Sequence, residues 1–170
     1  ETDAITKFDY DAMNRLTGKI EPTNESVNYT FNNQGETDAM MNLVTNIDYN
    51  AQNKITKKVF ANNLTTNYSY NTTDFRLNNI KTAALQDLSY TYDNASNIAS
   101  IKNNLTNKTQ TFGYDDLDRL TTAQEDNNGY THTYSYNAIG NLMKFTNAGT
   151  PIDYTYGQNA GVHALTSSTE

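Results

Sequence analysis

The densest group of carboxylates in the sequence is formed by Asp115, Asp116 and Asp118. Closely spaced carboxylates can coordinate a hard cation such as Ca²⁺ through their oxygens. These three lack the alternating spacing and the closing glutamate of an EF-hand loop. Short Asp-rich segments also form turns, because the side chain accepts hydrogen bonds from the backbone that follows it. We therefore interpret the group as turn residues and expect no metal site.

General acid or base catalysis would have to use one of two histidines, His132 and His163, and the sequence contains no cysteine. Neither histidine lies in a recognisable catalytic motif. His132 alternates with Thr131 and Thr133, as an ordinary side chain of a half-exposed strand would. The lack of cysteine excludes disulfides, thiolate catalysis and Cys-ligated zinc. We expect no catalytic residue, no cofactor and no enzymatic activity.

The chain is acidic, with a formal net charge of -7 and a pI near 4.7. Its few Lys and Arg are scattered and form no basic patch that could bind the phosphate backbone of a nucleic acid. We therefore expect no nucleic-acid partner. No apolar run approaches the roughly 18 residues of a membrane span, so we expect no membrane insertion. The sequence begins at Glu1 rather than at methionine. We expect a fragment of a longer protein.

Aromatic residues recur at a nearly constant interval. Eight of them, which we call the anchors, are spaced by 21, 18, 21, 22, 22, 22 and 20 residues. They are Tyr10, Phe31, Tyr49, Tyr70, Tyr92, Tyr114, Tyr136 and Tyr156. A second apolar residue stands two positions before each anchor, for example Tyr134 before Tyr136. A ladder of such rings could pack against itself or stack on sugar rings, and the packing role is the stronger expectation.

The spacing of two apolar residues at i and i+2 is that of a β-strand with both on one face. Asp or Asn follows most anchors and favours a turn, after which an aliphatic residue begins a second extended stretch. In the stretch 55–59, we expect Ile55 and Val59 to share a face. Each unit of roughly 22 residues thus predicts a β-hairpin, and eight units predict about fifteen strands.

The predicted fold class is all-β, with tandem antiparallel β-hairpin repeats forming a curved or spiral repeat sheet. We expect residues 1–170 to form a single repeat array of about eight units. Two units are irregular. The second carries Met40 and Met41 in place of a clear Leu after its turn, and the fourth has an additional residue before Arg76 and Leu77. A bulge or a longer turn would absorb each difference.

The units that begin at Tyr10, Tyr114 and Tyr136 resemble the YD repeat, also called the Rhs repeat, in which Tyr-Asp is followed by two free residues, Gly, Arg or Asn, and Leu. The resemblance covers essentially the whole chain. Gly35 and Gly140 occupy the glycine position, and Asn14, Asn53, Asn97 and Asp118 are assigned to it elsewhere. Asn and Asp tolerate a left-handed backbone, so these replacements preserve the turn.

The resemblance implies a secreted or cell-surface protein. Members of this family form shells that enclose a toxin domain, or adhesive ectodomains of the teneurin type. The expected function is therefore a non-enzymatic structural segment, with the remaining repeats and an enclosed toxin domain as partners. The alternative is a carbohydrate-binding module that uses the tyrosine ladder. Asn-x-Ser/Thr triplets occur, for example at Asn28, Asn67 and Asn104. Because a chain this rich in Asn and Thr contains such triplets by chance, they do not establish glycosylation.

Overall fold

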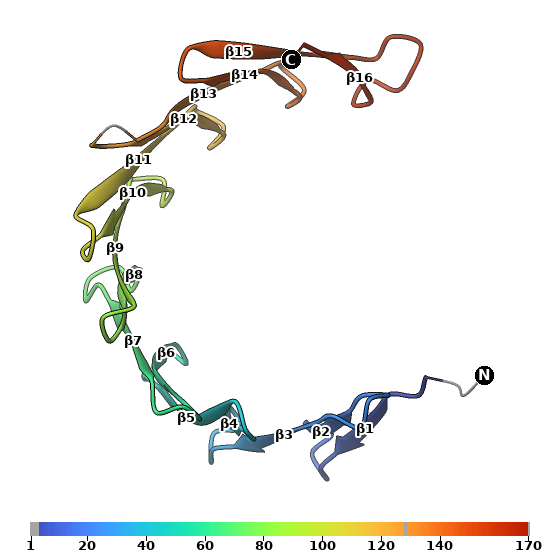
Figure 1. Ribbon diagram of the computed structural model, residues 1–170, viewed down its shortest axis with the longest axis vertical. Coiled ribbons are helices and arrows are strands. Elements are labelled where there is room, and N and C mark those ends of the chain that lie inside the picture. Colours follow the sequence, from blue (N-terminus) through green and yellow to red (C-terminus); the bar gives the residue numbers. More distant parts are fainter. Residues whose placement is uncertain (1–3, 128, 170) are drawn as a thin grey trace. The chain divides into compact units, whose positions relative to one another are not determined.

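A computed structural model describes residues 4–127 and 129–169 of the chain. This part of the chain contains 16 β-strands and no helix. It divides into two compact units, Glu1–Asp87 and Leu88–Glu170, and the boundary lies inside the ninth strand. The strands, shown in Figure 1, are β1 Lys7–Tyr10, β2 Leu16–Ile20, β3 Ser26–Phe31, β4 Thr37–Met40, β5 Val44–Tyr49, β6 Ile55–Phe60, β7 Thr65–Tyr70, β8 Leu77–Thr82, β9 Gln86–Tyr92, β10 Ile98–Asn103, β11 Lys108–Tyr114, β12 Leu120–Glu125, β13 Thr131–Tyr136, β14 Leu142–Asn147, β15 Thr150–Tyr156 and β16 Leu165–Ser168.

Each unit is an open antiparallel sheet in which consecutive strands are neighbours, β1 to β8 in the first and β9 to β16 in the second. Within each unit the strands follow one another along a curved strip (Figure 1). The prediction of an all-β fold made of tandem antiparallel hairpins in a curved sheet is confirmed. The prediction of a single array over residues 1–170 stays a prediction.

All eight anchors lie at the same place in their hairpins. Each is the last residue of an odd-numbered strand and pairs with the first residue of the next strand, as Tyr114 pairs with Leu120 and Tyr136 with Leu142. The register shifts by one residue directly before the anchor in every hairpin, which is a β-bulge. The bulge increases local twist and bends the strip.

Five of the junctions between successive hairpins also share one register. In these junctions, one partner stands two positions after the first residue of an even-numbered strand. The other partner stands three positions before the next anchor. This rule gives the pairs Gly18 with Asn28, Lys57 with Asn67, Ser100 with Thr111, Thr122 with Thr133 and Lys144 with Asp153. These five junctions therefore have the same offset, whereas β4 meets β5 through the pair Met40 with Val44.

The bulge determines which side chains share a face. In β6, Ile55 pairs with Tyr49, but Val59 pairs with Asn46. Directly opposite residues lie on the same face, and Tyr49 and Asn46 are three residues apart on β5, so they point to opposite faces. The prediction that Ile55 and Val59 share a face was wrong. The extra residue after Ile55 reverses the alternation along the rest of the strand.

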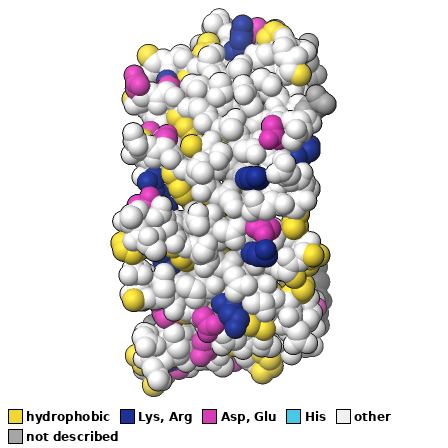
Figure 2. Space-filling model, turned by 90° about the vertical axis from the view of Figure 1, so that its left-hand side faces the viewer, with side chains coloured by type: hydrophobic (Ala, Val, Ile, Leu, Met, Phe, Trp, Pro, Cys, Tyr) yellow, Lys and Arg dark blue, Asp and Glu magenta, His cyan; other side chains and the backbone are white. Residues whose placement is uncertain are grey.

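One face of the strip is aromatic and aliphatic, and we call it the aromatic face. It pairs Tyr90 with Ile101, Phe112 with Ala123 and Tyr134 with Phe145 across neighbouring strands. The opposite face, the polar face, carries short polar side chains and ion pairs between strands, such as Thr91 with Ser100 and Lys144 with Asp153. Figure 2 shows one face of the molecule, on which uncharged polar groups predominate, charges of both signs are interspersed, and hydrophobic side chains form small separate areas.

The hydrophobic core is small, because within each unit the described strands form one layer and no second layer covers the aromatic face. Only Val44, Ile47 and Ala123 are buried hydrophobic residues among those described. The exposed surface is 11415 Å² for a mass of 19.1 kDa, whereas a compact monomer of this mass would expose about 8,400 Å². Most of the apolar side chains are thus half-buried against their neighbours on adjacent strands.

The two irregular hairpins differ in their turns. In the second, β4 is short and joins β5 through a tight turn in which Asn42 has a φ of 65°. In the fourth, the turn is one residue longer. Asn71 N–H donates to the Arg76 carbonyl, and Phe75, with a φ of 57°, donates back to Asn71. A longer turn absorbs the additional residue there, as predicted. The described chain contains no helix that could cross a membrane.

Candidate functional site

The anchors are the candidate site that the sequence proposes, and most of their hydroxyl groups are used in backbone hydrogen bonds. In four anchors the hydroxyl donates to the carbonyl of the first residue of the preceding even-numbered strand. The donor and acceptor pairs are Tyr49 to Thr37 at 2.7 Å, Tyr70 to Ile55 at 2.8 Å, Tyr114 to Ile98 at 3.0 Å and Tyr136 to Leu120 at 2.9 Å. Each bond connects one hairpin to the hairpin before it.

Partial burial of these rings keeps the hydroxyls protonated. Loss of water around the ring raises the pKa of Tyr70 and Tyr114 above the ordinary value of a tyrosine, and it does the same for Tyr49 and Tyr136. A neutral phenol is a hydrogen-bond donor, whereas a phenolate can only accept. The hydroxyls therefore remain donors to the carbonyls at any physiological pH.

The other anchors lie at the same place in the register. Phe31 has no hydroxyl, and Tyr92 is the last residue of β9, where it pairs with Ile98. Tyr156 ends β15 and pairs with Leu165. Tyr10 ends β1 and is the most open of them, with 57% of its surface exposed. No preceding strand lies beside β1 in the described chain.

The Asp or Asn after six of the anchors closes a turn of one common design. In the hairpin of Tyr114, the Asp115 carboxylate accepts hydrogen bonds from the N–H groups of Leu117 and Arg119, both at 3.0 Å. Asn137 does the same for Ile139 at 3.1 Å and for Asn141 at 2.9 Å. Either Asp or Asn suffices, because only one side-chain oxygen is needed.

The turn requires a left-handed residue three positions after the Asp or Asn. Gly140 has a φ of 89°, Asn53 a φ of 56° and Asp118 a φ of 58°. In the fifth hairpin this residue is Ser96, with a φ of 78°, and not Asn97. The assignment of Asn97 to the glycine position was wrong by one residue. Asn97 instead occupies the arginine position of the repeat, where its amide donates to Asp93 and Asp118.

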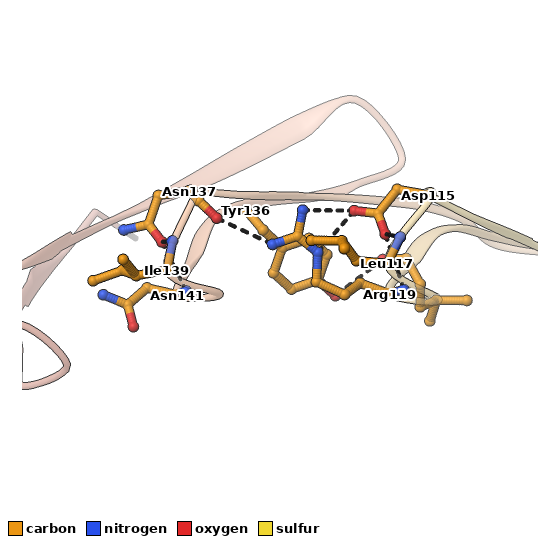
Figure 3. Close-up of polar contacts among 8 residues, drawn as sticks. Asp115, Leu117, Arg119, Tyr136, Asn137, Ile139 and Asn141 are labelled. Carbon is orange, nitrogen blue, oxygen red and sulfur yellow. Dashed lines mark hydrogen bonds and ion pairs between the residues drawn. The ribbon is translucent and has the colours of Figure 1, made fainter.

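A cation in the arginine position links each of several hairpins to the next (Figure 3). Arg119 forms an ion pair with Asp115 in its own turn, at 2.7 Å. Its guanidinium carbon lies 4.8 Å from the centre of the Tyr136 ring, and its Nη1 donates to the Asn137 carbonyl at 3.0 Å. Equivalent stacking places Arg15 over the Phe31 ring and Lys54 over the Tyr70 ring.

These contacts limit what the anchors offer to a ligand. An aromatic ring binds a sugar by presenting an open face and a free hydroxyl edge. In Tyr136, for example, the hydroxyl is bonded to Leu120 and the ring is covered by Arg119. The arrangement is suited to joining hairpins, by a hydrogen bond to the backbone and a cation–π contact.

The aspartates and histidines singled out in the sequence lie in separate structural contacts. Asp115 pairs with Arg119, Asp116 is exposed, and Asp118 accepts a hydrogen bond from Asn97. His132 contacts Asn147 from near the start of β13, and His163 contacts Asn141 from the last turn. Within residues 4–127 and 129–169, no three or more acidic, His or Cys side chains are grouped as a metal site would require.

A second aromatic group was not predicted. The rings of Tyr130 and His132 stack with centres 4.5 Å apart, and Phe145 lies 5.1 Å from His132 and 5.3 Å from Tyr134. Sequence reasoning treated His132 alone, although Tyr130, directly before β13, alternates with His132 and Tyr134 on that strand. That spacing places all three on the aromatic face and could have revealed the group. Phe145 joins it only through the pairing of β13 with β14.

Shallow depressions also lie on the surface of the sheet. Ile98, Ile101, Phe112, Tyr114 and Leu120 line an apolar hollow of about 230 Å³. A larger and more polar groove of about 710 Å³ lies beside Tyr49, with Glu36, Asp38 and Asp48 among its lining residues. Neither gathers a nucleophile and a base at hydrogen-bond distance.

Several solved toxin structures share this fold. The chain aligns with a chain of the crystal structure of TcdB2-TccC3-Cdc42 with a TM-score of 0.77 and 23% sequence identity, over 94% of this chain and 10% of that chain. It aligns with the Photorhabdus luminescens Tc holotoxin pore with a TM-score of 0.78, 22% identity and the same coverage. No protein-family model and no curated protein sequence matches the chain. It spans about a tenth of the length of these toxin chains, and at this identity the likeness is one of fold.

Proposed function

We propose that this chain is a non-enzymatic structural segment of a secreted or cell-surface protein with YD (Rhs) repeats, and that it contributes to the wall of a toxin-enclosing shell or to an adhesive scaffold. The observation that carries the proposal is the use of the anchors. Their hydroxyls and rings hold successive hairpins together, as Tyr136 does through Leu120 and Arg119. The likeness in fold to chains of Tc toxin structures supports the shell in particular.

The uncovered aromatic face gives the shell a physical basis. A wall that encloses another polypeptide needs one surface for the contents and one for the solvent. The aromatic face offers half-buried apolar side chains around the hollow of Phe112 and Ile101, and the polar face offers short polar groups and ion pairs. Exposed apolar patches rimmed by polar groups mark surfaces that contact other proteins. The proposed partners are the remaining repeats and an enclosed toxin domain.

Binding of a permanently unfolded polypeptide tests this role. A fluorescent, reduced and carboxymethylated lactalbumin should bind the chain, with a rise in anisotropy. Phe112→Lys places a charge on the aromatic face and should weaken binding about tenfold. Thr111→Lys, at an exposed neighbouring position on the polar face, is the matched control and should leave binding unchanged. Circular dichroism must show native β content in both variants, and Ile101→Lys replaces Phe112→Lys if the latter unfolds.

Two results would count against the shell wall: no binding by the unmodified chain, or equal weakening by the two lysine variants. A carbohydrate-binding module is the second candidate function, and it rests on the half-exposed anchor rings. A glycan array separates the two functions. Reproducible glycan binding that is lost in Tyr92→Ala and Tyr114→Ala, with folding retained, would favour the carbohydrate role.

A further inference from the structure

The second hairpin carries a carboxylate where other hairpins carry a cation. Arg119 stands directly before the residue whose carbonyl accepts the Tyr136 hydroxyl, and its charge stacks on that ring. Glu36 occupies the same place, directly before Thr37, whose carbonyl accepts the Tyr49 hydroxyl. A negative charge therefore lies beside Tyr49 at the position where the repeat elsewhere puts a positive one.

The Glu36 carboxylate is only partly satisfied. Its Oε2 accepts a hydrogen bond from the Asn32 side chain at 2.8 Å. Its Oε1 is buried and has no hydrogen-bond partner among the described residues. A buried charged oxygen without a donor is unfavourable, and a positively charged ligand would supply that donor. Loss of water around the Tyr49 ring raises the pKa of that tyrosine, and the nearby charges of Glu36 and Asp38 raise it further.

A groove of about 710 Å³ lies at this position, and we call it the acidic groove. It is lined by residues of β4 and β5 and of the turns after Phe31 and Tyr49. The described pairing of β4 with β5 is confined to Met40 and Val44. The volume falls within the roughly 300–1,000 Å³ of ordinary ligand sites. Tyr49 and Glu36 both belong to the lining, so a ligand in the groove can contact the ring and the carboxylate together.

The charge of the acidic groove has one sign. Glu36, Asp38 and Asp48 line it, and none of its described lining residues is a lysine or arginine. The Asp38 carboxylate accepts a hydrogen bond from the Thr30 hydroxyl, which is neutral. Asp48 has a lysine, Lys57, only at 3.9 Å on the next strand. Grouped negative charges of this kind attract a cation and repel an anion.

We propose that the acidic groove binds an arginine side chain of a partner polypeptide. The guanidinium stacks on the Tyr49 ring and donates hydrogen bonds to the Glu36 carboxylate. The partner thus supplies at Tyr49 the cation that Arg119 supplies at Tyr136. This inference goes beyond the proposed function and does not depend on it.

The chemistry of the site favours arginine over lysine. A guanidinium is planar, stacks on aromatic rings and presents a fork of donors that fits a carboxylate. The chain itself places arginine over an anchor ring twice, with Arg15 on Phe31 and Arg119 on Tyr136. The groove is also long enough in volume to hold residues on either side of the bound arginine.

Titration of a capped tripeptide, acetyl-Gly-Arg-Gly-amide, into the isotope-labelled chain tests the site by NMR. The caps remove the terminal charges, so the guanidinium is the only charge of the peptide. The amide resonances of Glu36 and Tyr49 report binding. We expect saturable shifts with a dissociation constant of about 1–10 mM. The matched peptide with lysine should bind about threefold or more weakly, and the one with glutamine should give no saturable shift.

Substitutions at Glu36 separate the site from general attraction to an acidic chain. Glu36→Gln keeps the shape of the side chain and removes its charge, so binding of the arginine peptide should weaken about five- to tenfold. Glu36→Arg supplies the cation from within the chain and should abolish binding. Glu25→Gln is the matched control, because Glu25 is exposed, lies outside the groove and changes the net charge equally. It should leave binding unchanged.

Asp48→Asn provides a second variant, at an exposed position of the groove, and should weaken binding about twofold. If Glu36→Gln loses the native NMR spectrum, the comparison of Asp48→Asn with Glu25→Gln decides in its place. The absence of saturable shifts with the arginine peptide would overturn the proposal. Equal weakening in the groove variant and in Glu25→Gln would also overturn it, as would binding of the glutamine peptide as tight as that of the arginine peptide.

Discussion

The hydroxyl of Tyr136 donates a hydrogen bond of 2.9 Å to the backbone carbonyl of Leu120, which belongs to the preceding hairpin. Sixteen residues separate the two along the chain. The bond forms only when β12 and β13 pair in their observed register. The tyrosine is thus both part of the apolar packing and a marker of correct alignment between hairpins.

Removing this hydroxyl should destabilise the chain. Tyr136→Phe keeps the ring and leaves the Leu120 carbonyl without its donor, so we expect a loss of about 0.5–1.5 kcal/mol in the free energy of unfolding. Urea denaturation followed by circular dichroism measures it. Tyr10→Phe is the control and should change the free energy of unfolding by less than the experimental error. A loss of equal size in both variants would show that the bond to Leu120 contributes nothing.

Removing a whole ring should matter more inside a unit than at the end of the chain. Tyr114 packs in the middle of the second unit, and Tyr114→Ala should cost about 2–4 kcal/mol. Tyr10 lies on the edge strand β1 and is 57% exposed, so Tyr10→Ala should cost less than about 1 kcal/mol. Thermal unfolding distinguishes the two. Equal losses would contradict the description of the chain as an array of hairpins stabilised by their neighbours.

Acid should destabilise the turns. The hydrogen bond and charge of Arg119 lower the pKa of Asp115 from its ordinary value of 3.8. A carboxylate with a lowered pKa in the folded state contributes stability above the pKa of the unfolded state, and this contribution is lost as the pH falls through the folded pKa. The melting temperature should therefore decrease as the pH is lowered below about 4. The decrease should be less steep in Asp115→Asn.

Asp115→Asn is informative because the chain already uses Asn at this position of the turn, at Asn50 and Asn137. The variant keeps the oxygen that accepts the backbone hydrogen bonds and loses only the charge opposite Arg119. Asp116→Asn is the matched control, since Asp116 is exposed and lies outside the ion pair. A pH profile that stays unchanged in Asp115→Asn would rule out the ion pair as its origin.

The left-handed residue of the turn should tolerate Asn better than Ala. Gly140 has a φ of 89°, and a Cβ added there would meet nothing within 4 Å. The cost of a side chain is therefore one of backbone conformation alone. Gly140→Ala should lose about 1–2 kcal/mol, whereas Gly140→Asn should lose less, because Asn occupies the same position at Asn14 and Asn53. Chemical denaturation of the two variants checks the order.

The repeat itself could be predicted because its signals are local. An aromatic pair at i and i+2, a following Asp or Asn and a left-handed residue determine a strand and a turn within about ten residues of sequence. All eight anchors accordingly end a strand, and the longer turn after Tyr70 was predicted from the additional residue before Arg76. The face of Val59 was not predicted correctly, because a β-bulge leaves no signal in a pattern of alternating residues.

The contacts between hairpins could not be predicted either. The bond from Tyr114 to Ile98 and the position of Arg119 over Tyr136 join residues that are 16 and 17 positions apart. Such contacts depend on the register of two strands connected by a variable turn, and the sequence of either hairpin alone does not determine it. Once the register is known, the arginine position of the repeat acquires a clear role.

The register that five junctions share has a consequence for how such a chain can change its length in evolution. These junctions pair the same two positions of the repeat, as in Gly18 with Asn28 and Thr122 with Thr133. Recombination that deletes or duplicates one whole repeat would bring together an even-numbered and an odd-numbered strand that already fit. Such a protein can therefore become longer or shorter in steps of one hairpin, without compensating mutations at the new junction.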